Sequence, residues 1–334
     1  MSIGYRIPGS QERVNCANYF VSKFQEIDIN FTYFLHNFTA YSTECQNLLF
    51  KLNENWTNIV ILGAHYDSRA KATKDDYNPD DPVPGANDGA SGSAVLIELA
   101  RVLYDKKDDL KCQIWFIFFD AEDQGNDGKG YGMPDWDWCV GSNTFVQVIH
   151  NYYNSSKESF ECMILLDMVG GDNLKFINEL HSISSLLNEL FQIGRQLGYT
   201  NEFPANPISA YITDDHLAFV NYGIPSVDLI ISFWNKNPDW PYHHTTEDNL
   251  DHIDTQSLKA TGDTIEQFIL NNYLKNSTYQ GNSPWYEDIN ALPTGVLSNI
   301  IISVAIIGSA IAIIIFYAIH QINLKKTKEI NQTF

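Results

Sequence analysis

Short apolar runs alternate with amphipathic segments along the first 272 residues of the chain. Almost wholly apolar runs, typical of buried parallel strands, occupy Asn58 to Gly63, Ile114 to Phe119, Met163 to Leu166 and Pro225 to Ile231. Apolar residues at helical spacing predict helices over Gln11 to Gln25, Ala90 to Tyr104, Ser182 to Gly198 and Thr255 to Leu270. This alternation predicts one α/β domain, residues 1–272, with a mainly parallel sheet covered by helices on both faces.

The clearest change in composition lies near the C-terminus. Residues 273–295 are rich in Asn, Ser, Pro and Gly and are typical of a linker. Residues 296–319 are uncharged and apolar, and at about 1.5 Å per residue they are long enough to cross a bilayer core of about 30 Å. We therefore expect a transmembrane helix over 296–319, followed by a short basic tail over 320–334, and a membrane as one partner.

The charges around this segment predict an orientation. Lys325, Lys326 and Lys328 follow it, and such residues are retained in the cytoplasm, so the folded domain is expected outside the cytoplasm. Asn-x-Ser/Thr sequons agree with that side; they begin at Asn30, Asn37, Asn55, Asn154 and Asn276. The alternative is a tail-anchored protein whose folded domain lies in the cytoplasm, because residues 1–5 hold no signal peptide. The outward orientation supposes that the natural chain starts further upstream.

Charge and cysteine usage exclude two classes of site. The net charge of −20 would repel nucleic acid, so we expect no nucleic-acid partner. None of the five cysteines forms a CxxC pair, which argues against a thiolate zinc site. Cys112 and Cys162 each precede a predicted strand; a disulfide between them is one alternative, and small buried thiols are the favoured interpretation.

Metal-binding side chains stand close to the ends of the apolar runs or in the loops beside them. They are His65, Asp88, Glu122, Asp123, Asp167 and His244. Because parallel strands end at one edge of a sheet, ligands bind in the crevice there. Imidazoles and carboxylates without clustered thiolates suit zinc or a similar divalent ion. Two long polar loops, Arg69 to Pro84 and Gln124 to Asp137, flank these residues and are typical of functional loops.

The spacing of these residues along the chain suggests a separate chemical role for each of them. Asp67, two residues after His65, is suited to accept the His65 ring N–H and fix its tautomer. Asp88 lies in a glycine-flanked loop before a helix, where its two oxygens could bridge two metal ions. Glu122 and Asp123 are neighbours, so their side chains diverge, which suits one general base and one metal ligand.

The chain resembles the M28 family of zinc-dependent enzymes in six segments, HYDS, GANDGASG, FFDAEDQG, LLDMVG, TDDHLAF and HHTTEDNLD, in this order and spacing. That family contains aminopeptidases and animal-type glutaminyl cyclases on one fold. The resemblance covers about residues 5–270 and implies a three-layer αβα sandwich with a mainly parallel, mixed central sheet of the zinc-exopeptidase type. It also implies one or two zinc ions as cofactor.

The family's ligand pattern carries over residue by residue. The resemblance implies one zinc held by His65 and Asp167, another held by Asp123 and His244, with Asp88 bridging them and Glu122 as general base. The favoured function is a membrane-anchored aminopeptidase, in which metal-activated water attacks the first bond at a peptide N-terminus.

Some residues favour the alternative, a glutaminyl-peptide cyclotransferase that forms N-terminal pyroglutamate. The pair Asp214-Asp215 resembles the sequence of the cyclases, in which the first Asp and Asp167 form a proton-handling network. Asp215 would hold the site residues in place without itself binding the metal. The sequence Gly89 to Gly92 resembles the peptidases instead.

The substrate pocket is the least defined part of this prediction. Trp136 is a candidate for an aromatic wall, with Trp138 as the alternative, and His243 takes the place of a cyclase tryptophan. A remote third hypothesis is an inactive, membrane-tethered binding module, against which the retention of Glu122 and all the ligands argues. Side-chain specificity and oligomeric state are not predicted.

Overall fold

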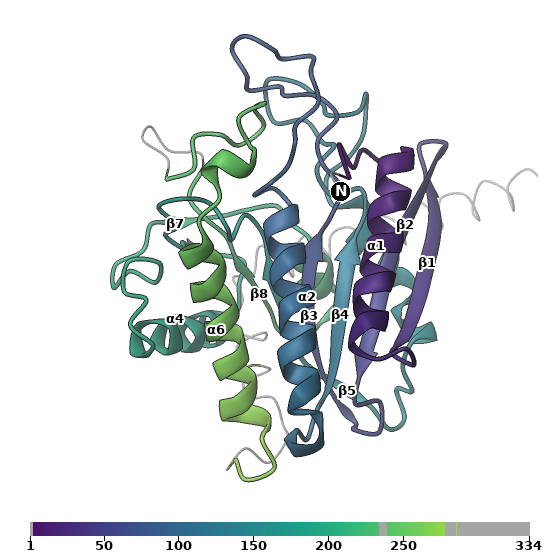
Figure 1. Ribbon diagram of the computed structural model, residues 1–334, viewed down its shortest axis with the longest axis vertical. Helices are drawn as coiled ribbons and strands as arrows, with labels where there is room; N and C mark the ends of the chain where they lie inside the picture. Colours follow the sequence, from purple (N-terminus) through teal and green to yellow (C-terminus); the bar gives the residue numbers. More distant parts are fainter. Residues whose placement is uncertain (1–2, 234–238, 278–284, 286–334) are drawn as a thin grey trace, which may run out of the picture. The chain divides into compact units, whose positions relative to one another are not determined.

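Six strands form a mixed central sheet in the order β1-β2-β4-β3-β5-β8 (Figure 1). The computed structural model describes residues 3–233, 239–277 and 285. The strands are β1 (Thr32–Ala40), β2 (Thr43–Leu52), β3 (Asn58–His65), β4 (Gln113–Phe119), β5 (Ser159–Leu166) and β8 (Ser226–Leu229). Neighbours from β4 to β8 run parallel, whereas β1, β2 and β4 pair antiparallel. A small parallel pair joins β6 (Asn178–Glu179) to β7 (Ser209–Ala210).

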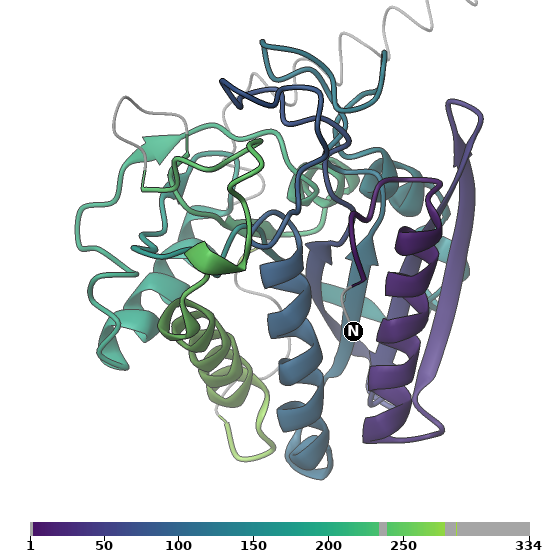
Figure 2. The same cartoon turned by 45° about the horizontal axis from the view of Figure 1, so that its top comes forward.

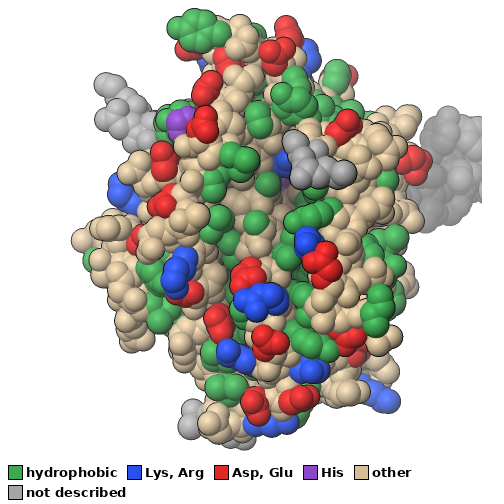
Figure 3. Space-filling view, in the orientation of Figure 1, with side chains coloured by type: hydrophobic (Ala, Val, Ile, Leu, Met, Phe, Trp, Pro, Cys, Tyr) green, Lys and Arg blue, Asp and Glu red, His purple; other side chains and the backbone are tan. Residues whose placement is uncertain are grey.

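Helices cover both faces of this sheet. They are α1 (Gln11–Ile27), α2 (Ala90–Asp105), α3 (Val140–Val148), α4 (Ser184–Gln196), α5 (His216–Tyr222) and α6 (Thr255–Tyr273), with short 3₁₀ turns at Lys107–Asp109, Ile149–Asn151 and Leu250–His252. In Figure 1 α1, α2 and α6 lie side by side in front of the sheet. The outer surface of this layer mixes acidic, basic and apolar side chains (Figure 3).

Strand β4 shows why two helical layers form. All its side chains are buried, and alternate residues point to opposite faces. Phe118 stacks on Phe20 of α1 at 4.3 Å between ring centroids. On the other face, Phe119 packs against Phe145 of α3 and Phe219 of α5. A strand buried on both sides needs a continuous apolar run, which is the pattern that predicted it.

The predicted strands and helices are present, with shifted boundaries. Strand β3 continues to His65, so this residue is the last of the strand, and β5 begins at Ser159 rather than at Met163. The sequence did not predict the hairpin of β1 and β2 or the helices α3 and α5. The disulfide alternative was wrong, because Cys112 and Cys162 are both buried free thiols.

The predicted linker, transmembrane helix and basic tail lie almost wholly outside the described residues and stay predictions. Among the helices that the structure does describe, none is long and apolar enough to cross a membrane.

The C-terminal ends of β3, β4 and β5 meet at one edge of the sheet. Figure 2 brings this edge forward, with long loops projecting beyond it. Two of these loops span residues 69–84 and 124–137, which follow β3 and β4. The fold therefore places the polar residues that follow three apolar strands around a common space.

Candidate metal centre

One cavity of about 350 Å³ collects the predicted site residues. Its lining includes Asp88, Glu122, Asp123, Asp167, Asp214, His243 and His244. His65 lies at its base, buried beneath Asp88 and Asp167. The sequence separates some of these residues by more than a hundred positions, and the parallel strands bring them together.

Two sets of potential ligand atoms share Asp88. In the first set, His65 Nε2 lies 3.0 Å from Asp88 Oδ1 and 3.1 Å from Asp167 Oδ1. In the second, His244 Nε2 lies 2.9 Å from Asp123 Oδ1 and 3.8 Å from Asp88 Oδ2. Each oxygen of the Asp88 carboxylate therefore faces a different imidazole, as a bridging ligand requires.

The conformation of the loop that carries Asp88 depends on Gly89 and on the carboxylate of Asp248, which the sequence did not predict. A Cβ atom on Gly89 would lie 2.5 Å from the His65 ring, so only glycine allows this close approach. The backbone N–H groups of Asn87 and Asp88 donate to the buried carboxylate of Asp248, at 2.7 and 3.1 Å. Asp248 belongs to the HHTTEDNLD segment, but no local pattern in the sequence indicates this contact.

Asp67 fixes both His65 and the turn after β4. Its Oδ1 lies 3.4 Å from His65 Nδ1, at the long end of hydrogen bonding, on the side of the ring away from Asp88. The same carboxylate accepts the backbone N–H of Glu122 at 3.0 Å and of Asp123 at 3.3 Å. It also accepts an N–H from the Gln124 side chain at 3.0 Å. One buried carboxylate therefore positions an imidazole and the two neighbouring acids.

Glu122 lies at the wall of the cavity beside two other titratable groups. The Cys139 thiol donates to Glu122 Oε1 at 3.3 Å, and one carboxylate oxygen of Asp214 lies within 4.8 Å of both. Burial raises the pKa of Glu122 well above its usual value, although the charge of His65 opposes this effect. A carboxyl group with a raised pKa is suited to exchanging protons near neutral pH.

Asp214 is part of a buried acidic cluster that the sequence predicted only in part. Burial and the charge of Asp167 raise the pKa of Asp214 to about 8. Ligand-type atoms of Asp214, His216 and Asp228 lie within 4.8 Å of one another, and His216 Nε2 lies 3.2 Å from Glu179 Oε2. Asp215 is fully buried next to Asp214, and it is absent from the described lining of the cavity.

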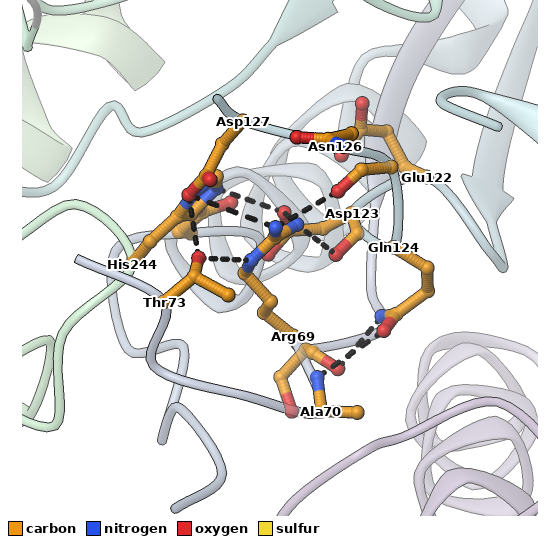
Figure 4. A network of polar contacts seen from close by, with 12 residues as sticks. Arg69, Ala70, Thr73, Glu122, Asp123, Gln124, Asn126, Asp127 and His244 are labelled. Carbon is orange, nitrogen blue, oxygen red and sulfur yellow. Dashed lines mark hydrogen bonds and ion pairs between the residues drawn. The ribbon is translucent and has the colours of Figure 1, made fainter. Parts of the chain in front are cut away.

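A second buried network supports His244 through the Nδ1 atom of its ring (Figure 4). His244 Nδ1 lies 2.8 Å from Asp127 Oδ2, so one ring nitrogen contacts Asp127 and the other faces the cavity. Arg69 donates to Asp123 Oδ1 at 3.3 Å and to the Gly125 carbonyl at 2.8 Å. Although burial opposes ionisation, hydrogen bonds from His244 and Thr73 hold the pKa of Asp127 below its usual range. The sequence did not predict these supporting residues. It indicated only that the two loops that carry them are typical of functional loops.

The aromatic wall is Trp138, and the prediction of Trp136 requires correction. Trp136 is buried in a small cluster away from the cavity and stacks on Tyr41 at 5.1 Å. Trp138 lines the cavity and stacks on His244 at 5.8 Å. Two residues in left-handed conformations, Asp135 and Cys139, turn the chain around them, and this turn decides which indole faces inward.

The remaining wall contains His243, as predicted, with Lys74 and Phe233 beside it. Burial lowers the pKa of His243 well below its usual value, so its ring is neutral and can accept a hydrogen bond. Lys74 Nζ lies 2.7 Å from His243 Nδ1.

These residues fit a divalent zinc centre. The ligand-type atoms are imidazole nitrogens and carboxylate oxygens, as in hydrolytic zinc sites. Asp123 Oδ2 is buried and has no hydrogen-bond partner among the described atoms, which is costly unless a cation compensates. Burial, with the charges of Asp88 and Asp123, raises the pKa of Asp167 to about 6 against the effect of His65. A bound cation would offset this crowding of carboxylates.

Comparison with known proteins agrees with this geometry. Residues 47–269 match peptidase family M28. Aminopeptidase YwaD from Bacillus subtilis is 30% identical over 212 residues, which cover 62% of this chain and 40% of YwaD. The glutaminyl-peptide cyclotransferase of Drosophila melanogaster is 25% identical over 248 residues, covering 67% of this chain and 64% of that protein. The matches to these curated relatives thus span less than two thirds of their length.

Solved structures of both kinds share the fold. A Zn-dependent exopeptidase from Parabacteroides distasonis superimposes with a TM-score of 0.71 at 31% identity, covering 81% of this chain and 94% of the other. A glutaminyl cyclase from Bacteroides thetaiotaomicron gives a TM-score of 0.71 at 30% identity, covering 81% and 93%. The predicted fold class, a mixed α/β sheet of the zinc-exopeptidase type, is confirmed.

Asp127→Asn tests whether Asp127 supports His244. The amide keeps the shape but removes the negative charge that polarises the imidazole, and loss of such supporting partners costs about 10–100-fold in metal affinity. We expect that loss in zinc competition against a chelating dye, with a smaller zinc-dependent rise in melting temperature. Asp80→Asn is the matched control, because the Asp80 side chain is 85% exposed and its one ion pair within the described part of the chain is with Lys71. Equal zinc affinity in both variants would remove Asp127 from this role.

Proposed function

The chain belongs to peptidase family M28, and on this premise we propose that it is a zinc-dependent aminopeptidase that acts at peptide N-termini. The observation that carries the proposal is the shared Asp88 carboxylate, whose two oxygens face separate imidazole–carboxylate pairs. This arrangement supports two ions, and two-metal sites are typical of aminopeptidases.

The proposed ligands are His65 and Asp167 for one ion, Asp123 and His244 for the other, with Asp88 shared. Zinc bound there would act as a Lewis acid on the substrate carbonyl and make water a nucleophile at neutral pH.

Glu122 is the proposed general base. Its side chain reaches the cavity from the same turn as Asp123, yet the structure gives it no imidazole partner among the described ion pairs, so it remains available for proton transfer. Its raised pKa suits it to take a proton from water and return it to the leaving amine. The Cys139 thiol, donating to Oε1, restricts the orientation of the carboxyl group.

The cavity also suits a peptide N-terminus by charge and size. Its lining includes the carboxylates of Asp88, Glu122, Asp123, Asp127, Asp167 and Asp214, which favour a cationic α-amine. A volume of about 350 Å³ lies at the small end of ligand sites, so it fits a short terminal segment of a chain.

Glutaminyl cyclisation is the second candidate, and the position of Asp214 favours it. Asp214 lies beside Glu122, and its pKa of about 8 leaves it largely protonated at neutral pH. A protonated acid next to a base can relay the proton that leaves an attacking α-amine and deliver it to departing ammonia. The relatives of both kinds give this candidate equal standing by similarity.

Glu122→Gln tests the base role. The amide keeps the shape of the side chain but cannot accept the proton, so turnover should fall by at least about 10²–10⁴-fold. Zinc content should stay unchanged, because Glu122 is not among the proposed ligands. The assay measures release from aminoacyl-anilides, together with cyclisation of Gln-initiated peptides, by the zinc-loaded protein. Glu247→Gln, an exposed acid near His244, is the control. Full activity of Glu122→Gln would exclude this residue as the base.

Asp214→Asn separates the two candidate reactions. Asparagine cannot relay a proton, so cyclisation should be lost, whereas hydrolysis of aminoacyl-anilides needs only Glu122 and should weaken less than tenfold. Both reactions are measured on one preparation after its zinc content has been matched to the wild type. A variant that loses hydrolysis and keeps cyclisation would contradict the proposed roles.

A further inference from the structure

Lys74 places a basic side chain in the lining of an acidic cavity. Among the described residues that line the cavity, it is the one Lys or Arg, and it stands with six carboxylates. Lys71, in the same loop, forms a surface ion pair with Asp80 at 2.6 Å. Lys74 forms no ion pair with a described carboxylate, and its Nζ instead contacts Nδ1 of the His243 ring. Asp88, Asp123 and Asp127 act on this half-buried ammonium through their charge without direct contact, so a bound carboxylate would supply the ion pair that they do not form.

The backbone holds Lys74 in place for such a role. Its N–H donates to the carbonyl of His244 at 3.1 Å. The next residue, Asp75, accepts the backbone N–H of Thr246 at 3.0 Å. The loop 69–84 is thus tied to the segment that supplies His244, at that histidine and two residues after it. Lys74 is positioned before any ligand arrives, which lowers the entropic cost of binding.

The ammonium also has capacity for a ligand. A lysine carries three N–H donors, and His243 uses one of them. The Phe233 ring lies 5.7 Å from Nζ and limits access of water on that side. The remaining donors can serve an acceptor in the cavity, and the acceptor that neutralises the charge is a carboxylate.

The position of Lys74 determines how far a carboxylate bound to it would lie from the proposed metal ligands. His243 lies between them: its Nδ1 contacts Lys74 Nζ, and its Nε2 lies 3.8 Å from Asp88 Oδ2. One imidazole ring with a contact on each side thus separates the ammonium from the Asp88 carboxylate. An extended peptide covers about 3.3–3.6 Å per residue, so this separation corresponds to two or three residues.

We propose that Lys74 binds a substrate carboxylate two or three residues from the N-terminus, so that the site selects short peptides with a free C-terminus or peptides with an acidic side chain there. This specificity rests on the proposed action at peptide N-termini. It runs against the overall charge of the protein, since a net charge of −20 disfavours an added carboxylate everywhere else. A measured preference for carboxylate is therefore attributable to a local cation.

Binding is measured by calorimetry on zinc-loaded Glu122→Gln protein, which prevents turnover. The probes are Gln-Ala-Ala as free acid and as amide, and the amides Gln-Glu-Ala and Gln-Gln-Ala. N-terminal Gln serves both candidate reactions; the first pair tests a terminal carboxylate and the second an acidic side chain. We expect at least one acid to bind about tenfold more tightly than its neutral partner, as a charge-assisted hydrogen bond does. Which pair shows the preference identifies the source of the carboxylate.

Lys74→Met in the same background should reduce this preference to within twofold, and Lys74→Arg should retain part of it. Lys71→Met is the matched control, because it removes the same charge from the same loop at an exposed position. Equal binding of acids and amides, binding of none of the probes, or loss of the preference in Lys71→Met overturns the proposal. Turnover of the amide peptides by the wild-type protein tests the proposed function separately, since that reaction does not need Lys74.

Discussion

Six carboxylates crowd around one cavity, and the surrounding loops and strand ends are arranged to hold them there. Asp88, Asp123 and Asp167 are all buried, and they crowd around the imidazoles of His65, His243 and His244. Such a group of acids is unfavourable on its own, because burial and mutual repulsion both oppose ionisation. Divalent cations reverse that balance, which is why a metal centre explains the arrangement better than a structural role.

Hydrogen bonds to the backbone hold in place the strand ends and loops that carry these acids. Strand β3 ends in His65, Asp67 secures the turn after β4, and Asp248 secures the loop of Asp88. A second layer of partners orients the imidazoles: Asp67 contacts His65, and Asp127 contacts His244. Each imidazole thus has one nitrogen facing the cavity and the other engaged with a carboxylate, as metal-binding histidines commonly have.

Much of this centre could be predicted from sequence because of how parallel sheets are built. An apolar run followed at once by a polar residue, as at His65 and Asp167, marks a strand end, and strand ends of a parallel sheet converge. The positions of Glu122, the proposed general base, and of Asp123 followed from the same rule. The two-layer covering of the sheet followed from runs that are apolar on both faces.

Other features depend on contacts that no local pattern encodes. Trp136 and Trp138 are two residues apart, and only the turn around them decides that the second faces the cavity. Asp127 lies 117 positions from His244, in a loop whose composition is that of any polar loop. His216 and Glu179 come from a short helix and a two-residue strand, which are too brief for periodicity to detect, whereas Asp228 lies in a predicted strand whose apolar run did not indicate its partners. Strand β1 is exposed along much of its length, so it lacks the apolar run that identified the central strands.

The zinc content of the purified protein decides whether these carboxylates and imidazoles form a metal centre. Native mass spectrometry at neutral pH, after loading with zinc and removal of excess, should find two zinc ions per chain. Asp88→Asn should hold at most one, because its side chain can no longer serve both imidazole–carboxylate pairs. A wild-type protein that takes up no zinc, or an Asp88→Asn variant that retains the full wild-type zinc content, would contradict the account.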